Sequence, residues 1–255
     1  MELKGKRILI TGGASGIGLE SVKQFLALGA HVIICGRNQD KLDAVTKVLT
    51  QVTAIKCDVQ DENNLKELYK EIVWLGGIDV LYNNAGVGTR PLNLGMKDSQ
   101  HFVDASYEMN VNYLGMIRIT DLFMDMLKSR KEAAIINTTS VLSYLPAVLA
   151  PTYSASKAAA RFYTESLRVH LGVINSTVKV FELLPPLVET DLTAGLEEKM
   201  MTPEAVVKEL IAGIKRDQYT IRVGGAKLLY TINRLLPGTA FGILNPKKKI
   251  TPLLV

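Results

Sequence analysis

Cysteine and histidine are scarce in this sequence, which limits the chemistry that it can support. The chain has two Cys and three His among 255 residues. Cys35 and Cys57 each end an apolar run, as small buried residues commonly do, and the three His are far apart without metal-ligand spacing. We therefore expect neither a disulfide framework nor a metal site.

Long apolar runs are absent as well. No window reaches the roughly 18 uncharged apolar residues that a membrane-spanning helix needs, and the first residues, MELKGKRILITGG, lack the apolar core of a signal peptide. A cytoplasmic location is the expectation.

A concentrated patch of one charge is also missing. Lys and Arg outnumber Asp and Glu by 30 to 25, but they are scattered, and the longest basic run is Lys247 to Lys249. Nucleic-acid binding usually needs a denser basic surface, so we expect no nucleic-acid partner. The mild positive excess suits a small phosphate-bearing ligand better.

What the sequence does contain is a regular alternation of short apolar runs with amphipathic helical segments. It shows no internal repeat, linker or low-complexity tract, so we expect one domain over residues 1–255, with a core at 6–223 and a helical extension at 224–255. This alternation predicts a doubly wound α/β fold with a mostly parallel sheet and helices on both faces. The seven expected strands are residues 7–11, 31–35, 54–59, 78–86, 133–140, 177–184 and 219–223.

A glycine-rich turn follows the first expected strand and opens the first expected helix. Its pattern is Thr11-Gly12-x-x-x-Gly16-x-Gly18. Glycines at these places let the backbone approach a pyrophosphate, and the helix that follows presents its N-terminal N–H groups to the anion. A tight turn without a ligand is the alternative, but the strand and helix on either side favour a dinucleotide site.

Two further polar features lie in the middle of the chain. Asn83-Asn84-Ala85-Gly86 ends the fourth expected strand, where the alternative to a ligand site is a simple turn. Asn112 stands inside an expected helix over residues 102–129, although Asn is a poor helix former, so its presence needs a structural reason.

Three reactive side chains follow the fifth expected strand. Ser140 comes directly after that strand, and Tyr153 and Lys157 are one helical turn apart in the next helix. A free phenol has a pKa of about 10, and a nearby ammonium should lower the pKa of Tyr153, making it a candidate general acid and base. A Tyr–Lys pair at this spacing is more often an ordinary surface pair, so its weight depends on the other motifs.

Taken together and in order, these motifs resemble the short-chain dehydrogenase/reductase family over residues 6–223. The segment ICGRN, the double proline Pro185-Pro186 and the segment TPEAVVKELIAGIKR resemble more closely the DltE-like oxidoreductases of Gram-positive bacteria. The resemblance implies a Rossmann-type fold and hydride transfer between a nicotinamide cofactor and a carbonyl or secondary alcohol. One departure is Pro186, where the family usually has Gly; it removes an N–H and fixes φ at the start of the segment that covers the site.

The resemblance also implies roles for single residues. Tyr153 would exchange the proton with the substrate oxygen, Ser140 would hydrogen-bond that oxygen, and Lys157 would hold the nicotinamide ribose. Asn112 would anchor a water that relays protons. The implied cofactor contacts are Gly12, Ser15, Gly16, Ile17 and Gly18 at the pyrophosphate and ribose, Asp58 and Val59 at the adenine, Asn84, Ala85 and Gly86 near the adenosine ribose, Tyr153 and Lys157, and Pro185, Val188 and Thr190 beside the carboxamide.

The residues after the second expected strand predict which dinucleotide is preferred. Enzymes of this kind that use NAD usually carry an acid there for the ribose 2′-OH, whereas this chain has Gly36-Arg37-Asn38 and no acid until Asp40. The guanidinium of Arg37 is a planar fork of donors that suits a 2′-phosphate, although a solvated turn residue is the alternative. We expect NADP(H) to be preferred over NAD(H) by about 10- to 100-fold.

The substrate should be a small, apolar carbonyl or alcohol. Residues 187–201 (LVETDLTAGLEEKMM) lack a clean period and suggest a mobile lid. The expected apolar lining comprises Leu142, Tyr144, Leu145, Val148, Leu149, Leu187, Leu192, Met200 and Met201. A regulator or redox sensor that binds a dinucleotide without turnover is the alternative function.

Two expected helices carry apolar residues over more of their surface than contact with one sheet would cover. Ala158, Ala159, Ala160, Phe162 and Leu167 in the helix after Tyr153, with the helix of Asn112, predict a homodimer or homotetramer. In the extension, an apolar stripe precedes Pro237-Gly238, where the helix should end. The stripe is Leu228, Leu229, Ile232, Leu235 and Leu236. Packing on its own domain or on a partner subunit is favoured for it, with contact to a membrane surface as the weaker alternative.

Overall fold

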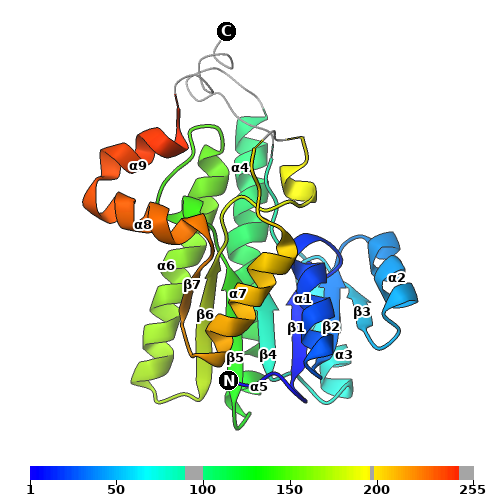
Figure 1. Cartoon of the computed structure of the whole chain (residues 1–255). Coiled ribbons are helices and arrows are strands. Elements are labelled where there is room, and N and C mark those ends of the chain that lie inside the picture. Colours follow the sequence, from blue (N-terminus) through cyan, green and yellow to red (C-terminus); the bar gives the residue numbers. More distant parts are fainter. Residues whose placement is uncertain (90–99, 196–197, 247–255) are drawn as a thin grey trace.

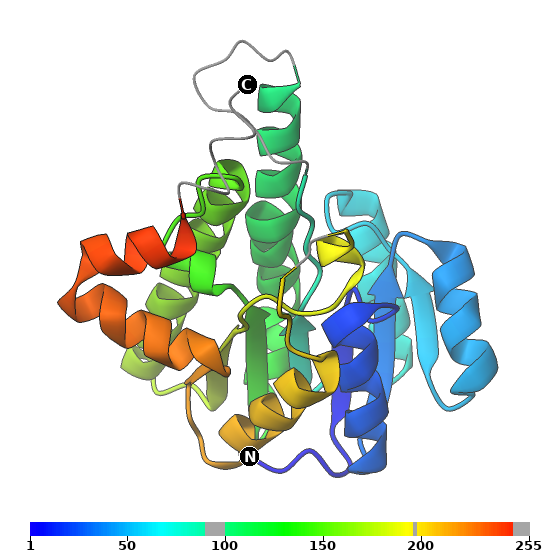
Figure 2. The same cartoon turned by 45° about the horizontal axis from the view of Figure 1, so that its top comes forward.

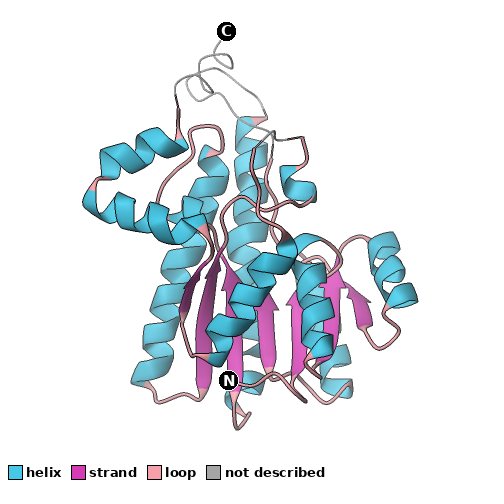
Figure 3. Cartoon of the chain, in the orientation of Figure 1, coloured by secondary structure: helices cyan, strands magenta, loops and turns pink. Residues whose placement is uncertain are grey.

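Seven parallel strands form the centre of the protein. The computed structural model describes residues 1–89, 100–195 and 198–246, and within them the strands follow the order β3-β2-β1-β4-β5-β6-β7 in one sheet (Figure 3). The predicted doubly wound α/β fold is confirmed. The strands are β1 (Arg7–Thr11), β2 (His31–Gly36), β3 (Thr53–Lys56), β4 (Val80–Asn83), β5 (Ala133–Thr138), β6 (Val178–Leu184) and β7 (Thr220–Arg222).

The apolar strand runs are buried on both faces, as parallel strands between helix layers must be. In β1, Leu9 pairs with Ile33 of β2 and Leu81 of β4. Leu9 faces one apolar core, while its neighbours Ile8 and Ile10 face the other. Successive side chains of a strand point to opposite faces, so one short run serves both cores.

Helices cover both faces of the sheet (Figure 1). Side chains of α1, α2 and α7, including Phe25 and Leu210, build one core, and those of α3, α5 and α6, including Leu68 and Phe123, build the other. The α-helices are α1 (Gly16–Ala27), α2 (Gln39–Val48), α3 (Glu62–Trp74), α4 (His101–Met109), α5 (Met116–Lys128), α6 (Pro151–Val173), α7 (Pro203–Lys215), α8 (Gly225–Leu235) and α9 (Pro237–Leu244).

Several strands are shorter than the sequence predicts, and β4 and β3 show why. The fourth expected strand reaches residue 86, but β4 ends at Asn83, because the Asn84 N–H leaves the ladder and donates to Thr11 Oγ1 at 3.0 Å. The third ends at Lys56 instead of residue 59. There Asp58 Oδ1 accepts a bond from the Gln60 N–H at 2.9 Å, which turns the chain.

The expected helix over residues 102–129 is interrupted. A π-helical turn over Asn110–Gly115 separates α4 from α5. Such turns are frequently found at functional sites. A Cβ on Gly115 would lie 2.7 Å from Val59 Cγ2, so only glycine allows this turn to pack against the loop after β3.

Helix starts and stops follow the sequence with one exception. Thr202 caps α7 by accepting from the Ala205 N–H at 3.3 Å, as expected. The stripe helix α8 ends at Leu235, also as expected, but Pro237 then begins α9, which was not predicted. Proline at the first helical position is favourable, so it can start a helix as well as stop one.

The carboxyl ends of the strands lie at one edge of the sheet, and β1 lies between β2 and β4, where the strand order reverses. Doubly wound folds bind ligands at this point. The pair α8 and α9 stands to the side of the sheet near this edge (Figures 1 and 2). No helix in the described part of the chain is long and apolar enough to cross a membrane.

Candidate active site

The glycine-rich turn leaves β1 at the switch point. Gly12 and Gly16 have positive φ angles of 65° and 51°, which glycine adopts without strain. A Cβ on Gly18 would lie 2.2 Å from the Gly12 carbonyl oxygen, so the turn closes tightly on the helix. Ser15 is the N-cap of α1 but makes no side-chain capping bond. The first N–H groups of α1, which include that of Ile17, are therefore not capped by a side chain, as an anion site requires.

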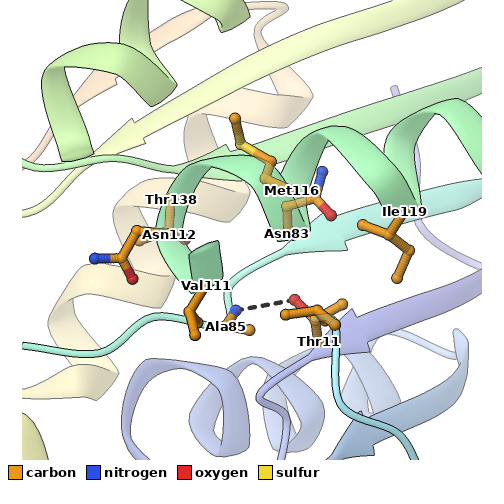
Figure 4. Close-up of a pocket in the computed structure, with 10 residues that line it drawn as sticks. Thr11, Asn83, Ala85, Val111, Asn112, Met116, Ile119 and Thr138 are labelled. Carbon is orange, nitrogen blue, oxygen red and sulfur yellow. Dashed lines mark hydrogen bonds between the residues drawn. The ribbon is translucent and has the colours of Figure 1, made fainter. Parts of the chain in front are cut away.

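The end of β4 is bound to this turn. Thr11 Oγ1 accepts from the Asn84 N–H at 3.0 Å. It also accepts from the Ala85 N–H at 2.9 Å (Figure 4). The Asn84 amide donates to the Gly12 carbonyl oxygen at 3.2 Å. A Cβ on Gly86 would lie 3.3 Å from Lys157 Nζ. The predicted residues of the two strand ends and Lys157 therefore come together.

A small cavity of about 10 Å³ lies behind these strand ends, with room for about one water molecule (Figure 4). Its walls come from β1, β4, β5, the π-helical turn and the loop after β3. The lining residues are Thr11, Val59, Asn83, Ala85, Val111, Asn112, Gly115, Met116, Ile119 and Thr138. The cavity shows that Val59, Ala85 and Asn112, predicted from separate motifs, lie at one place.

Asn112 lies in the π-helical turn, and its side chain joins three segments. Its Oδ1 accepts from the Val87 N–H at 2.8 Å, and its Nδ2 donates to the Val87 carbonyl oxygen and to Ser156 Oγ, both at 2.9 Å. Ser156 belongs to α6, beside Lys157. The unfavourable Asn is therefore retained because its amide fixes the segment after β4 against the helix of Tyr153 and Lys157.

Ser140, Tyr153 and Lys157 converge at the end of β5. Lys157 is buried, its Nζ donates to the Thr138 carbonyl oxygen at 3.0 Å, and Nζ lies 5.7 Å from the centre of the Tyr153 ring. Ser140 Oγ accepts from the Leu142 N–H at 3.1 Å. The Ser140 hydroxyl also lies near enough to the Tyr153 phenol to influence its pKa. The three side chains are thus adjacent, and the surface-pair alternative does not apply.

The charge states of this group differ from the prediction. Burial raises the pKa of Tyr153 to about 12, with a further increase from the charge of Glu108, while the hydrogen bond from Ser140 opposes the shift. Burial also lowers the pKa of Lys157 to about 8. The expectation that Lys157 lowers the pKa of Tyr153 was wrong for the protein alone, because desolvation of the phenolate dominates.

Glu108 is a residue of this site that the sequence did not reveal. It is 1% exposed, and its Oε1 accepts from the Thr89 N–H at 2.7 Å and the Thr89 hydroxyl at 2.8 Å. Its Oε2 is buried without a hydrogen-bond partner. A buried carboxylate with one oxygen unpaired is energetically costly. The only sequence signal was an acidic residue one helical turn before Asn112.

The adenosine end of the predicted site is more open. Arg37 is exposed, and its guanidinium carbon lies 5.5 Å from the centre of the Tyr107 ring. Val59 is buried, and the Asp58 carboxylate faces the Gln60 N–H as described above. Tyr107 was not predicted, since a single aromatic residue on a helix gives no motif. The pair of Arg37 and Tyr107 lies beside the loop where adenine was expected.

The lid segment, residues 187–201, folds back across the glycine-rich turn. The Pro185 carbonyl oxygen accepts from the Val141 N–H at 3.3 Å. Val188 forms a β-bridge with Met201. A Cβ on Gly16 would lie 2.9 Å from Thr190 Cγ2. Thr190 therefore lies beside the glycine-rich turn, while the contact of Pro185, Val188 and Thr190 with a carboxamide stays a prediction. Residues 196–197 are outside the described part of the chain.

The residues of the expected apolar lining lie in different surroundings. Leu192 is exposed and lies 3.3 Å from the position of a Cβ on Gly88, which itself adjoins the Tyr153 ring. Leu145 is buried at 3% exposure, and Met201 packs against the main core. These two side chains are therefore part of the protein's own packing.

The arrangement described so far is that of a dehydrogenase, and comparison with known proteins agrees. The family described as short chain dehydrogenase matches residues 6–201, and the chain belongs to this oxidoreductase family. A relative is "Uncharacterized oxidoreductase DltE" of Bacillus subtilis (strain 168), 33% identical over 228 residues, which cover 87% of this chain and 89% of the relative.

Solved structures show the same fold. A short chain dehydrogenase from Burkholderia cenocepacia J2315, in complex with NADP, has a TM-score of 0.83 and 25% identity, covering 96% of this chain and 99% of that one. A short chain dehydrogenase/reductase from Burkholderia phymatum, in complex with NAD, has a TM-score of 0.82 and 21% identity. The match covers 92% of this chain and 96% of that one. The similarity therefore extends over almost the whole chain.

Proposed function

We propose that the protein is an NADP-dependent oxidoreductase that interconverts a carbonyl and a secondary alcohol on a small, apolar molecule. The observation that carries this proposal is the convergence of Ser140, Tyr153 and Lys157 beside the switch point of the sheet. There the phenol adjoins the Ser140 hydroxyl, and the Lys157 ammonium lies 5.7 Å from the Tyr153 ring centre. An acid, an oxygen-binding hydroxyl and a fixed positive charge are what carbonyl reduction needs from a protein.

The residues fit a nicotinamide dinucleotide. The uncapped N-terminus of α1 and the close approach of Gly12 and Gly18 suit a pyrophosphate, and Thr190 of the lid lies beside Gly16. When bound, the nicotinamide ring supplies or accepts the hydride. Lys157 would hold the ribose next to it, with Gly86 leaving space for the ammonium group.

Residues of the protein itself would transfer the proton of the reaction. Ser140 would hold the substrate oxygen while the Tyr153 hydroxyl donates its proton to that oxygen as negative charge develops. The raised pKa of Tyr153, about 12, keeps the phenol protonated near neutrality. Asn112 fixes the segment at Val87 and would anchor a water that returns a proton from solvent. A protonated phenol is the form that carbonyl reduction requires.

The choice of NADP rests on Arg37. Its side chain is exposed at the end of β2, no acid lies before Asp40, and Asn38 is already used in capping α2 through the Lys41 N–H at 2.9 Å. We expect isothermal titration to show about 10- to 100-fold tighter binding of NADP than NAD. Arg37→Ala should remove most of that preference, whereas Lys47→Ala in the last turn of α2 should not. If the unaltered protein binds NAD more tightly than NADP, NADP is not the preferred cofactor.

A panel of apolar ketones and aldehydes, assayed by NADPH oxidation, tests the reaction itself. The nearest described apolar side chain of the lid is Leu192, which adjoins Gly88 beside Tyr153, so apolar substrates are expected to react faster than charged ones. If the protein binds NADPH but oxidises it with no member of the panel, the alternative holds: a dinucleotide-binding regulator or redox sensor without turnover.

A further inference from the structure

Apolar side chains of α8 and α9 are exposed to solvent. We call these two helices, residues 225–244, the C-terminal hairpin (Figure 2). Its most exposed large apolar residues are Leu228 at 66%, Leu235 at 73%, Leu236 at 59%, Phe241 at 42% and Ile243 at 56%. Of the predicted stripe, only Leu229 and Ile232 are half-buried. From the sequence, packing on its own domain or on a partner subunit was favoured. Packing on its own domain covers only part of the stripe.

The same part of the sequence is free of acidic residues. Although the chain has 25 Asp and Glu, none occurs in residues 218–255. The basic residues of this stretch are Arg222, Lys227, Arg234, Lys247, Lys248 and Lys249. Lys227 and Arg234 belong to the hairpin and are exposed. Lys227 is paired with Glu209 of α7 at 2.8 Å. The hairpin itself therefore adds the charge of Arg234, and the other basic residues of this stretch lie outside it.

We propose that the C-terminal hairpin binds the surface of an anionic lipid bilayer. A helix with exposed apolar residues and basic neighbours lies in the plane of such a surface, with its apolar side chains at the boundary of headgroups and acyl chains. Each Lys or Arg near an anionic surface raises the bound-to-free ratio about fivefold at physiological salt. With 11 and 8 residues, α8 and α9 are too short to span a bilayer, so the contact is peripheral.

Charge argues against a second copy of the chain as the occupant of this surface. A two-fold contact would place the hairpin against itself. Lys227 is already paired with Glu209, but a contact centred on the hairpin would bring the Arg234 side chains of both copies together, with no acid of residues 218–255 to compensate them. An anionic lipid surface is complementary to that charge, whereas the hairpin is not complementary to itself.

The hairpin is also fixed to the loop between Ser140 and Tyr153. The Asn233 amide donates to the Tyr144 carbonyl oxygen at 3.2 Å, and the rings of Tyr144 and Tyr230 are 5.1 Å apart. Lipid bound at the hairpin would therefore lie next to a loop of the active site. That position suits an enzyme whose substrate is apolar.

Flotation of the full chain with lipid vesicles tests the proposal, and it does not depend on any catalytic activity. We expect the protein to float with vesicles that contain phosphatidylglycerol and to stay behind with vesicles of phosphatidylcholine alone. High salt should reverse the binding. The double substitution Leu235→Glu and Leu236→Glu should lower the bound-to-free ratio at least about tenfold. Val48→Glu, on α2 and equally exposed at 79%, is the matched control and should leave it unchanged.

Three results would overturn the proposal. One is failure of the unaltered protein to float with anionic vesicles. Another is an equal loss of binding in Val48→Glu. The third is a double variant that binds lipid normally but has a smaller particle mass by light scattering, which would assign the surface to a second copy of the chain. Circular dichroism melting of both variants checks that each is folded.

Discussion

The acidity of Tyr153 depends on its surroundings more than on its nearest charged neighbour. Lys157 is one helical turn away, yet burial raises the pKa of Tyr153 and lowers the pKa of Lys157. Each shift favours the uncharged form of its group, as desolvation always does. A positively charged nicotinamide ring is one partner that could restore the phenolate, so oxidation of an alcohol should need the bound cofactor more than reduction does.

A variant of Glu108 tests directly how neighbouring charge sets the pKa of Tyr153. Its charge raises the pKa of Tyr153, so Glu108→Gln should lower that pKa while the Gln side-chain oxygen keeps the bond to the Thr89 N–H. Alcohol oxidation requires the phenolate, and its rate rises with pH through the pKa of Tyr153. The pH–rate profile of the variant should therefore move to lower pH. The profile of Glu71→Gln, on α3, serves as the control, and an unshifted or upward-shifted profile in Glu108→Gln would contradict the assignment.

At the scale of elements, side chains from distant parts of the chain fix the segments around the site. Asn112 holds the segment after β4, and Asn245 holds the loop after Ser140. Asn245 Oδ1 accepts from the Val148 N–H at 2.7 Å, and its Nδ2 donates to the Pro146 carbonyl oxygen at 3.0 Å. Asn245 is 8% exposed and follows α9 directly. The C-terminal extension thus completes the active-site loop.

Asn245→Ala should therefore loosen that loop. We expect a several-fold rise in KM for the carbonyl substrate with NADPH affinity unchanged, because the loop lies between Ser140 and Tyr153 and away from the glycine-rich turn. The free energy of unfolding should fall by about 1–3 kcal/mol, the usual effect of leaving buried polar groups unpaired. Asn245→Asp, which still accepts from the Val148 N–H, should have a smaller effect on KM. An unchanged KM in both variants would show that Asn245 acts on stability alone.

The sequence predicted the elements whose signal is local. Apolar runs marked all seven strands, and Thr202 marked the start of α7. The π-helical turn was not predictable, because it depends on contacts between Asn112 and Val87 and between Gly115 and Val59, which are far apart in sequence. The residues that converge at the site were predictable as a set, whereas the position of Glu108 beside them required knowledge of what surrounds Tyr153.

At the scale of the whole molecule, α6 presents an uncovered apolar face. Phe162, Val169 and Val173 are 66%, 63% and 75% exposed. Two residues of the predicted interface, Ala160 and Leu167, contribute to the protein's own packing instead. The surface that remains is still apolar enough to favour association.

We expect a homodimer or homotetramer with α6 in the contact. Light scattering at micromolar concentration should give at least twice the chain mass of 28.0 kDa. The double substitution Phe162→Glu and Val169→Glu should shift the particle toward the monomer, because burying two carboxylates at the contact is unfavourable. A single species of 28.0 kDa for the unaltered protein would rule out this assembly.

The central claim is that Tyr153 transfers the proton in a nicotinamide-dependent reaction, and the Tyr153→Phe variant measures it most directly. With a carbonyl that the unaltered protein reduces, turnover in the variant should fall by about 10²- to 10⁴-fold, the range for loss of a general acid. NADPH affinity by titration should stay within a few-fold, because Lys157 and the glycine-rich turn remain. Tyr163→Phe, also on α6 and half-buried, should keep both properties. Near-native turnover in Tyr153→Phe would contradict the account.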